Sequence, residues 1–195
     1  MSADDFVRPA IVSDVEPIGK IHAATMTATL EAALDRGIPA DVASQITPAS
    51  LTPGWSQALT APPSPNYRVL TAVSHTRIVG FAALAPADQE LGSAPPEEPA
   101  PIVAEILALE VPEPDGRRGH GSRLLSACAD LAKEQNATEL QVWIAVGDEA
   151  HIRFYSSAGF APRGLQRTLA VGDDEVVEQC WYALLGEAPP AGEPR

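Results

Sequence analysis

Residues 104–125, AEILALEVPEPDGRRGHGSRLL, combine an apolar strand, a glycine-rich loop and the start of a helix. The strand is expected over residues 102–111, and its apolar content predicts a central position in a sheet. A strand–loop–helix unit leaves backbone N–H groups unpaired at the helix start, where the helix dipole adds partial positive charge. The segment therefore predicts an anion-binding site. The helix itself has one apolar face, formed by Leu124, Leu125, Cys128, Leu131 and Ala132.

The composition of the loop also suits an anion. Gly119 and Gly121 let the backbone approach a phosphate closely, because they have no Cβ atom. The loop is neither a Walker A loop nor the dinucleotide pattern GxGxxG, in which Leu124 would stand for the last glycine. A pyrophosphate-like ligand is expected, and the structural alternative is a loop of solvated arginines. Three arginines fall within seven residues of a chain whose net charge is −13: Arg117, Arg118 and Arg123.

The rest of the chain alternates between strands and helices. The order β-α-α-β-β-β-α-β-α-β-β predicts a mixed α/β domain with helices on both faces of a sheet. One helix is expected from Ser13 or Asp14 to Gly37, and helical pieces over 40–60 are expected to break at Pro48 and at Pro53-Gly54. The remaining helix covers DEAHIRFYSSAGF (148–160), and further strands are expected at 6–12, 67–74, 77–85, 139–146, 161–170 and 175–185.

Length and composition place these elements in one domain. The 195 residues suit a single domain over 1–186, with a Pro-rich loop at 86–101 and a disordered tail at 187–195. The net charge of −13 argues against nucleic acid and against an anionic membrane surface as partners. Two cysteines, no metal-binding cluster and no secretory signal predict a cytoplasmic protein without a metal. A homodimer is compatible with these features.

Two motifs resemble the GCN5-related N-acetyltransferases, the GNAT superfamily. The first is motif A, a strand followed by (Q/R)xxGx(G/A): Gly119 and Gly121 match, whereas Gly116 stands where Gln or Arg is usual. The resemblance implies that backbone amides of Arg117, Arg118, Gly119, His120, Gly121 and Ser122 bind the pyrophosphate of acetyl-CoA.

The second is motif B, NxxAxx(F/L)Y followed by GF, which resembles DEAHIRFYSSAGF. Asp148 and His151 depart from its Asn and Ala positions, whereas Phe154, Tyr155, Gly159 and Phe160 match. The resemblance covers 6–34 and 67–182. It implies a mixed, mostly antiparallel sheet whose central strands, 102–111 and 139–146, splay apart. The pantetheine arm of acetyl-CoA would pair in that gap with Leu109, Glu110 and Val111, and Asp148 is included among the cofactor-binding residues.

The resemblance also implies catalytic roles. Tyr155 matches the tyrosine that protonates the departing CoA thiolate in many relatives, and its structural alternative is a half-buried helix tyrosine. Glu105 lies where histone-acetylating relatives carry a general-base glutamate, with a solvent-facing glutamate as its alternative. Glu110 is a second candidate base, placed on the opposite face by simple strand alternation. His22 and His151 are first interpreted as structural residues, with His151 exposed, and Trp55 is a candidate for lining an acceptor pocket.

The function implied is acetyl-CoA-dependent N-acetyltransfer. An amine would attack the thioester directly, a backbone amide near Val111 would polarise the carbonyl oxygen, and no metal would be needed. The acceptor, a small molecule or a protein amine, is not identified by the sequence. The alternative is a non-catalytic acyl-CoA-binding module that acts as a sensor or partner.

Overall fold

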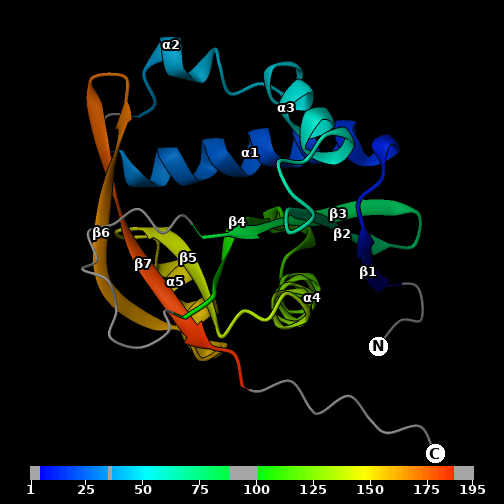
Figure 1. Cartoon of the computed structure of the whole chain (residues 1–195). Coiled ribbons are helices and arrows are strands. Elements are labelled where there is room, and N and C mark those ends of the chain that lie inside the picture. The colour runs from blue at the N-terminus through cyan, green and yellow to red at the C-terminus, as the bar shows by residue number, and fades with distance from the viewer. Residues whose placement is uncertain (1–4, 35–36, 88–100, 187–195) are drawn as a thin grey trace, which may run out of the picture.

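The computed structural model describes residues 5–34, 37–87 and 101–186, and its strands form one sheet between two layers of helices (Figure 1). The strands are β1 (Asp5–Pro9), β2 (Arg68–Ser74), β3 (Arg77–Pro86), β4 (Val103–Glu110), β5 (Glu139–Ala145), β6 (Ala161–Val171) and β7 (Asp174–Leu184). Their order is β1-β2-β3-β4-β5-β7-β6, and every neighbouring pair is antiparallel except β4 and β5. The mixed, mostly antiparallel sheet predicted from the sequence is confirmed.

Helices cover both faces of the sheet, as predicted (Figure 1). One layer contains α1 (Val15–Ala33), α2 (Ala40–Ala43) and α3 (Pro48–Thr60), and the other contains α4 (His120–Glu134) and α5 (Glu149–Ser157). The predicted apolar face of α4 packs into the main core, where Leu124 and Cys128 are fully buried. On the opposite face, Ile18 and Ile21 of α1 pack on Phe81 of β3.

The two central strands separate part of the way along their length. Parallel pairing joins Val103–Ile106 to 139–142 and then stops, although β4 continues to Glu110 and β5 to Ala145. In β4 the register against β3 shifts next to Leu107, which is a β-bulge. The predicted splayed strand pair is therefore present, and backbone groups on the β5 side of residues 107–110 have no strand partner.

Two predicted boundaries differ from the structure. The break expected at Pro53-Gly54 is wrong, because α3 runs through Pro53 from its start at Pro48. Thr47 caps this helix by accepting a hydrogen bond from the Ser50 amide at 3.1 Å. The first turn is therefore stabilised before Pro53, which lacks a backbone N–H group to donate. The tail at 187–195 and most of the 86–101 loop lie outside the described residues.

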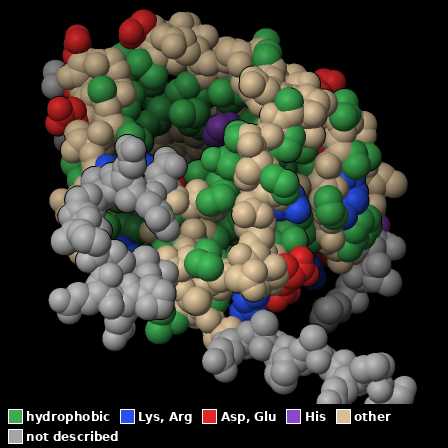
Figure 2. Space-filling view, in the orientation of Figure 1, with side chains coloured by type: hydrophobic (Ala, Val, Ile, Leu, Met, Phe, Trp, Pro, Cys, Tyr) green, Lys and Arg blue, Asp and Glu red, His purple; other side chains and the backbone are tan. Residues whose placement is uncertain are grey.

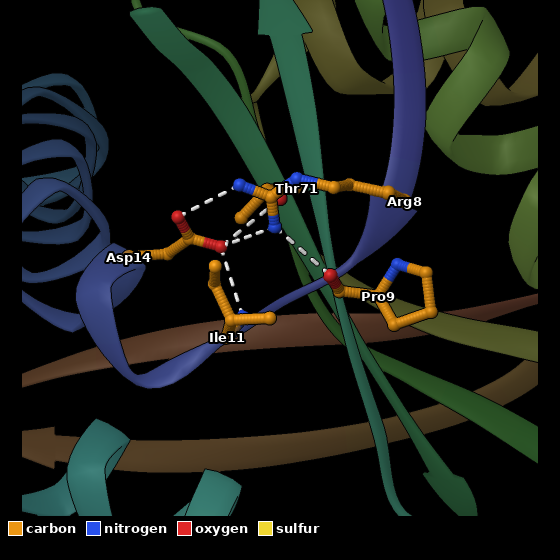
Figure 3. Close-up of polar contacts among 5 residues, drawn as sticks. All are labelled: Arg8, Pro9, Ile11, Asp14 and Thr71. Atoms are coloured by element: carbon orange, nitrogen blue, oxygen red, sulfur yellow. Dashed lines mark hydrogen bonds and ion pairs between the residues drawn. The ribbon is translucent and has the colours of Figure 1, made fainter.

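The first strand ends at Pro9, earlier than predicted, because Asp14 turns the chain there (Figure 3). The Asp14 carboxylate is 4% exposed and accepts two hydrogen bonds from the Arg8 guanidinium, at 2.5 and 2.9 Å. The Ile11 amide donates a further hydrogen bond at 2.9 Å, and the hydroxyl of buried Thr71 on β2 lies 3.5 Å away. Asp14 thus ties β1, the start of α1 and β2 together.

Asp14→Asn should destabilise the protein at neutral pH by about 1.5–3 kcal/mol, the usual contribution of hydrogen bonds to a charged group. Burial raises the pKa of Asp14, but hydrogen bonds from Arg8 and Ile11 outweigh it and the net pKa is lowered. A carboxylate with a lowered pKa stabilises the fold above its unfolded pKa of about 3.9 and loses that contribution as the pH falls through the folded value.

The measurement is urea unfolding of both proteins from pH 7 to pH 3, where the difference between them should shrink below about pH 3.9. Glu16→Gln is the control, because Glu16 forms only an exposed pair with Lys20 on the same helix. An equally large and pH-independent loss in Asp14→Asn would show that charge on Asp14 does not stabilise the fold.

Candidate active site

Residues 117–122, here called the amide loop, wrap around the N-terminus of α4. Gly119 is the N-cap residue with φ +81°, and Arg117 has φ +59°. Both lie in the left-handed region, which turns successive N–H groups toward the same side of a loop. Among the described residues, no backbone carbonyl accepts from the amides of 117–122, whereas the Arg123 amide already bonds to the Gly119 carbonyl at 3.1 Å. These amides can donate to an anion.

The amide loop is held in place from three directions. Arg77 of β3 makes two hydrogen bonds, at 3.0 and 2.6 Å, to buried Asp115 just before the loop. A Cβ atom on Gly121 would lie 3.4 Å from the Phe154 ring, so the small residue permits close packing of α4 on α5. A Cβ atom on Gly116 would lie 3.1 Å from the Glu113 carbonyl oxygen, so a Gln or Arg there would need this turn to shift.

The side chains of the amide loop divide into a buried one and an exposed set. The ring of His120 is 2% exposed, and its Nε2 has no hydrogen-bond partner among the described residues. Its ring thus points into the protein, and its backbone remains the group available to a ligand. Arg123 donates to the Arg118 carbonyl at 3.3 Å and so lies across the loop. The residues at the open rim are Arg117, Arg118, Gly119 and Ser122.

A cavity of about 140 Å³ opens where β4 and β5 diverge, and it is called the strand-gap cavity here. Leu109 and Glu110, two of the residues expected to flank a cofactor arm, line its β4 side, and Val111 follows directly after them. Asp148, His151 and Tyr155, from the start and first turns of α5, line the opposite side. Residues that the sequence placed in two separate motifs therefore meet at one cavity.

Asp148 and His151 form a pair at the start of α5. The Asp148 side chain accepts from the His151 amide at 3.0 Å, and its second oxygen lies 2.6 Å from His151 Nδ1. The Asp148 hydrogen bond raises the pKa of His151, with further help from the negative charge of Glu110. The expectation of an exposed structural His151 is wrong: the ring is half-buried, faces the cavity and stacks near Tyr155. The sequence did contain a signal for this pair, because His151 lies three residues after Asp148, an acidic N-cap residue.

Glu110 does not lie on the face opposite Glu105, as alternation predicted. The bulge at Leu107 shifts the strand by one residue, so that Glu105, Ala108 and Glu110 share the face toward α1. Ile106 and Leu109 both pack in the core on the other face. Burial raises the pKa of Glu110, and the positive charge of His151 offsets this only in part.

Glu105 lies where β4 and β5 are still paired. Its carboxylate accepts a hydrogen bond from Gln141 Nε2 at 2.7 Å, on the neighbouring residue of β5. Glu105 does not line the strand-gap cavity, whereas Glu110 does. The structure thus brings Glu110, and not Glu105, next to Tyr155.

Tyr155 is 2% exposed and packs edge-on against Phe154 and Phe160, with ring centroids 5.0 and 5.1 Å away. Burial raises the pKa of its phenol, and the negative charge of Glu110 raises it further. The phenol is therefore protonated at neutral pH. Among the described residues, no side chain or carbonyl forms a hydrogen bond with its hydroxyl, so this proton is available to a ligand in the cavity.

A second, larger hollow lies under α1 and α3 and is called the Trp55 pocket here. It has a volume of about 250 Å³ and adjoins the strand-gap cavity, because Leu107 and Ala108 line both. Figure 2 shows a hollow in the molecule that hydrophobic side chains surround and in which a histidine is visible. His22 and Trp55 are 33 positions apart in the chain, and no local pattern signalled that they would meet.

The described ranges, 5–34, 37–87 and 101–186, contain neither a membrane-spanning helix nor a metal-binding cluster. Within them no helix is long and apolar enough to cross a membrane. No group of three or more His, Cys, Asp or Glu side chains in these ranges is arranged to hold a metal ion.

Comparisons with known proteins agree with this geometry. The sequence model described as the acetyltransferase (GNAT) family matches residues 28–160. A ribosomal-protein-alanine N-acetyltransferase from Brucella melitensis has a similar structure, with a TM-score of 0.69 and 19% identity over 92% of this chain and 99% of that one. A comparison with curated protein sequences finds no significant match.

Two similar structures were solved with a ligand. A putative acetyltransferase from Salmonella typhimurium, with its cofactor acetyl-CoA, has a TM-score of 0.64 and 18% identity over 97% of this chain and all of that one. The PaiA N-acetyltransferase from Thermoplasma acidophilum, in complex with coenzyme A, has a TM-score of 0.62 and 15% identity over 91% and 98% of the two chains. At these identities the likeness establishes the fold.

Asp148→Asn should lower the pKa of His151, because it removes the negative charge while asparagine still caps α5. The sign follows from the raised pKa: the charged pair is present at low pH and is lost as the pH rises through the pKa of His151. NMR titration of the four histidines measures this directly. Glu149→Gln removes the same charge from an exposed neighbour paired with Arg153, and it should leave His151 unchanged. An unaltered His151 in Asp148→Asn would disprove the pairing.

Proposed function

The chain belongs to the acetyltransferase (GNAT) family, and from this premise we propose that it transfers the acetyl group of acetyl-CoA directly to a primary amine. The observation that carries the proposal is the divergence of β4 and β5. It opens a cavity with Glu110 and Tyr155 on its walls. The amide loop lies close by, because a Cβ atom on Gly121 would be 3.9 Å from Leu109, which lines the cavity.

Acetyl-CoA fits the groups available at the amide loop and in the strand-gap cavity. Its pyrophosphate matches the free amides of 117–122, the partial positive charge of the α4 N-terminus and the nearby arginines. Its pantetheine arm, with two amide groups, can pair with unpartnered backbone groups of β4 from Leu107 to Glu110, as an added strand would. The solved relatives that contain CoA or acetyl-CoA support the same ligand.

The chain supplies a base and an acid for the transfer. Glu110 takes a proton from the ammonium group of the acceptor and so frees the nitrogen to attack the thioester carbonyl; its raised pKa makes it a stronger base than an ordinary carboxylate. The backbone amide near Val111 polarises this carbonyl. Tyr155 donates its proton to the sulfur as the carbon–sulfur bond breaks. The nitrogen loses its second proton as the amide forms, and a proton from solvent restores the phenol of Tyr155. The products are an amide and CoA with a free thiol.

A thiol-release assay with acetyl-CoA and a set of primary amines tests the proposal. Amine-dependent release of CoA, with acetylated amine detected by mass spectrometry, is the expected result. Tight CoA binding without release on any amine would instead favour a binding module that senses acyl-CoA.

Gly119→Glu should weaken CoA binding by about 100-fold or more, which corresponds to roughly 2.7 kcal/mol. The substitution puts a carboxylate at the N-terminus of α4, where like charge repels the pyrophosphate. Isothermal calorimetry with CoA gives the affinity. Gly164→Glu is the matched control. Gly164 lies on the edge strand β6 with open space around it and has φ +82°, so this variant has a similar backbone strain and the same change of charge. Equal affinities in the two variants would refute the phosphate assignment.

Glu110→Gln should lower kcat/KM by about 10²–10⁴-fold, the range of general-base contributions, and leave CoA affinity unchanged. The loss should be largest at pH values above the raised pKa of Glu110 and below the pKa of the amine, where Glu110 is ionised and the amine is still protonated. Glu105→Gln is the comparison, since it removes the same charge on the same strand but outside the cavity. A greater loss in Glu105→Gln would return the base role to Glu105.

A further inference from the structure

We infer that the amine acceptor carries an apolar group about the size of one aromatic ring, which occupies the Trp55 pocket while the amine nitrogen reaches Glu110. This inference rests on the proposed function and specifies its substrate class. It depends on three features of the two adjoining hollows: their lining, their charge and their point of contact.

Most residues that line the Trp55 pocket are apolar. They include Trp55 and Ala58 of α3, Val69 and Ala83 of the sheet, and Leu107 of the β4 bulge. An apolar cavity of about 150 Å³ is enough to bind benzene. The volume of about 250 Å³ therefore accommodates one aromatic ring with a short alkyl chain.

The described lining of the pocket also contains no negative charge that would attract a second ammonium group of a polyamine. Burial lowers the pKa of His22. Its Nδ1 accepts a hydrogen bond from Trp55 Nε1 at 3.2 Å, so the neutral ring carries its proton on Nε2. The one formally charged residue in the described lining is Arg68, whose exposed guanidinium bonds to the Tyr67 carbonyl. The interior thus favours a neutral, apolar group.

The strand-gap cavity has the opposite character. Three carboxylates line it, those of Glu110, Asp148 and Glu178, and no Lys or Arg is among its described lining residues. His151 and Arg167 neutralise two of these carboxylates through ion pairs. Glu110 remains to attract the cationic amine.

The two hollows meet at the β4 bulge, where Leu107 and Ala108 line both. An amine with an apolar substituent can therefore span them, with its nitrogen beside Glu110 and its substituent against Trp55. A hydrophilic diamine would leave a cation in an apolar pocket, which costs free energy.

The experiment compares kcat/KM for four primary amines: 2-phenylethylamine, 3-methylbutylamine, ethanolamine and spermidine. The two apolar amines should exceed the other two by on the order of 10- to 100-fold, from the burial of one apolar group. A preference for ethanolamine or spermidine would overturn the inference while leaving acetyltransfer itself established.

Ala58→Phe should then raise KM for 2-phenylethylamine about tenfold or more and leave ethylamine unaffected, because the new ring fills the pocket. Ala49→Phe is the matched control, as an exposed alanine on the same helix outside the pocket. Similar losses on both amines in Ala58→Phe, or no loss on either, would contradict the assignment.

If no amine is acetylated, the proposed function fails, and calorimetry decides the inference separately. CoA-loaded protein should still bind 2-phenylethylamine, and Ala58→Phe should abolish this binding while Ala49→Phe should not. Absence of binding to the parent protein would overturn the inference.

Discussion

The parallel pairing of β4 with β5 ends after four residue pairs, and the remaining features of the site depend on this divergence. A fully paired sheet would have satisfied the backbone of 107–110 and left no cavity between the strands. Because the strands separate, Tyr155 and His151 of α5 can line the same cavity as Glu110 of β4. The core on the α4 side is continuous beneath the gap, so the opening does not leave the sheet unsupported.

The distribution of charge differs between the amide loop and the strand-gap cavity. The chain has a net charge of −13, yet the rim of the amide loop carries arginines and the dipole of α4. The strand-gap cavity holds three carboxylates instead. This distribution would orient a ligand that has an anionic end and would attract a cationic amine to the strand-gap cavity.

The sequence predicted the fold to the extent that local patterns determine it. Residues 104–125 contain strand, loop and helix signals in direct succession, and FYSSAGF marked α5, so both motifs were placed correctly. The predicted positions of side chains were wrong or incomplete where they depended on contacts between distant parts of the chain. The bulge at Leu107 has no composition signal, and it moved Glu110 to the face of Glu105. The contact of His22 with Trp55 and the several bonds to Asp14 depend on tertiary packing, which strand and helix periodicity do not encode.

The same bulge decides how β4 would respond to the loss or gain of a residue. On either side of Leu107, odd and even positions exchange their roles: residues 104 and 106 face the core before it, and 109 faces the core after it. Deletion of Leu107 would remove the bulge and leave a regular alternation, because Ala108 would then follow Ile106 directly and keep its face toward α1. Leu109 would stay in the core and Glu110 on the face toward α1. Insertion of one residue between Leu109 and Glu110 would instead turn Glu110 toward the core, so the strand tolerates a shorter bulge better than a longer end.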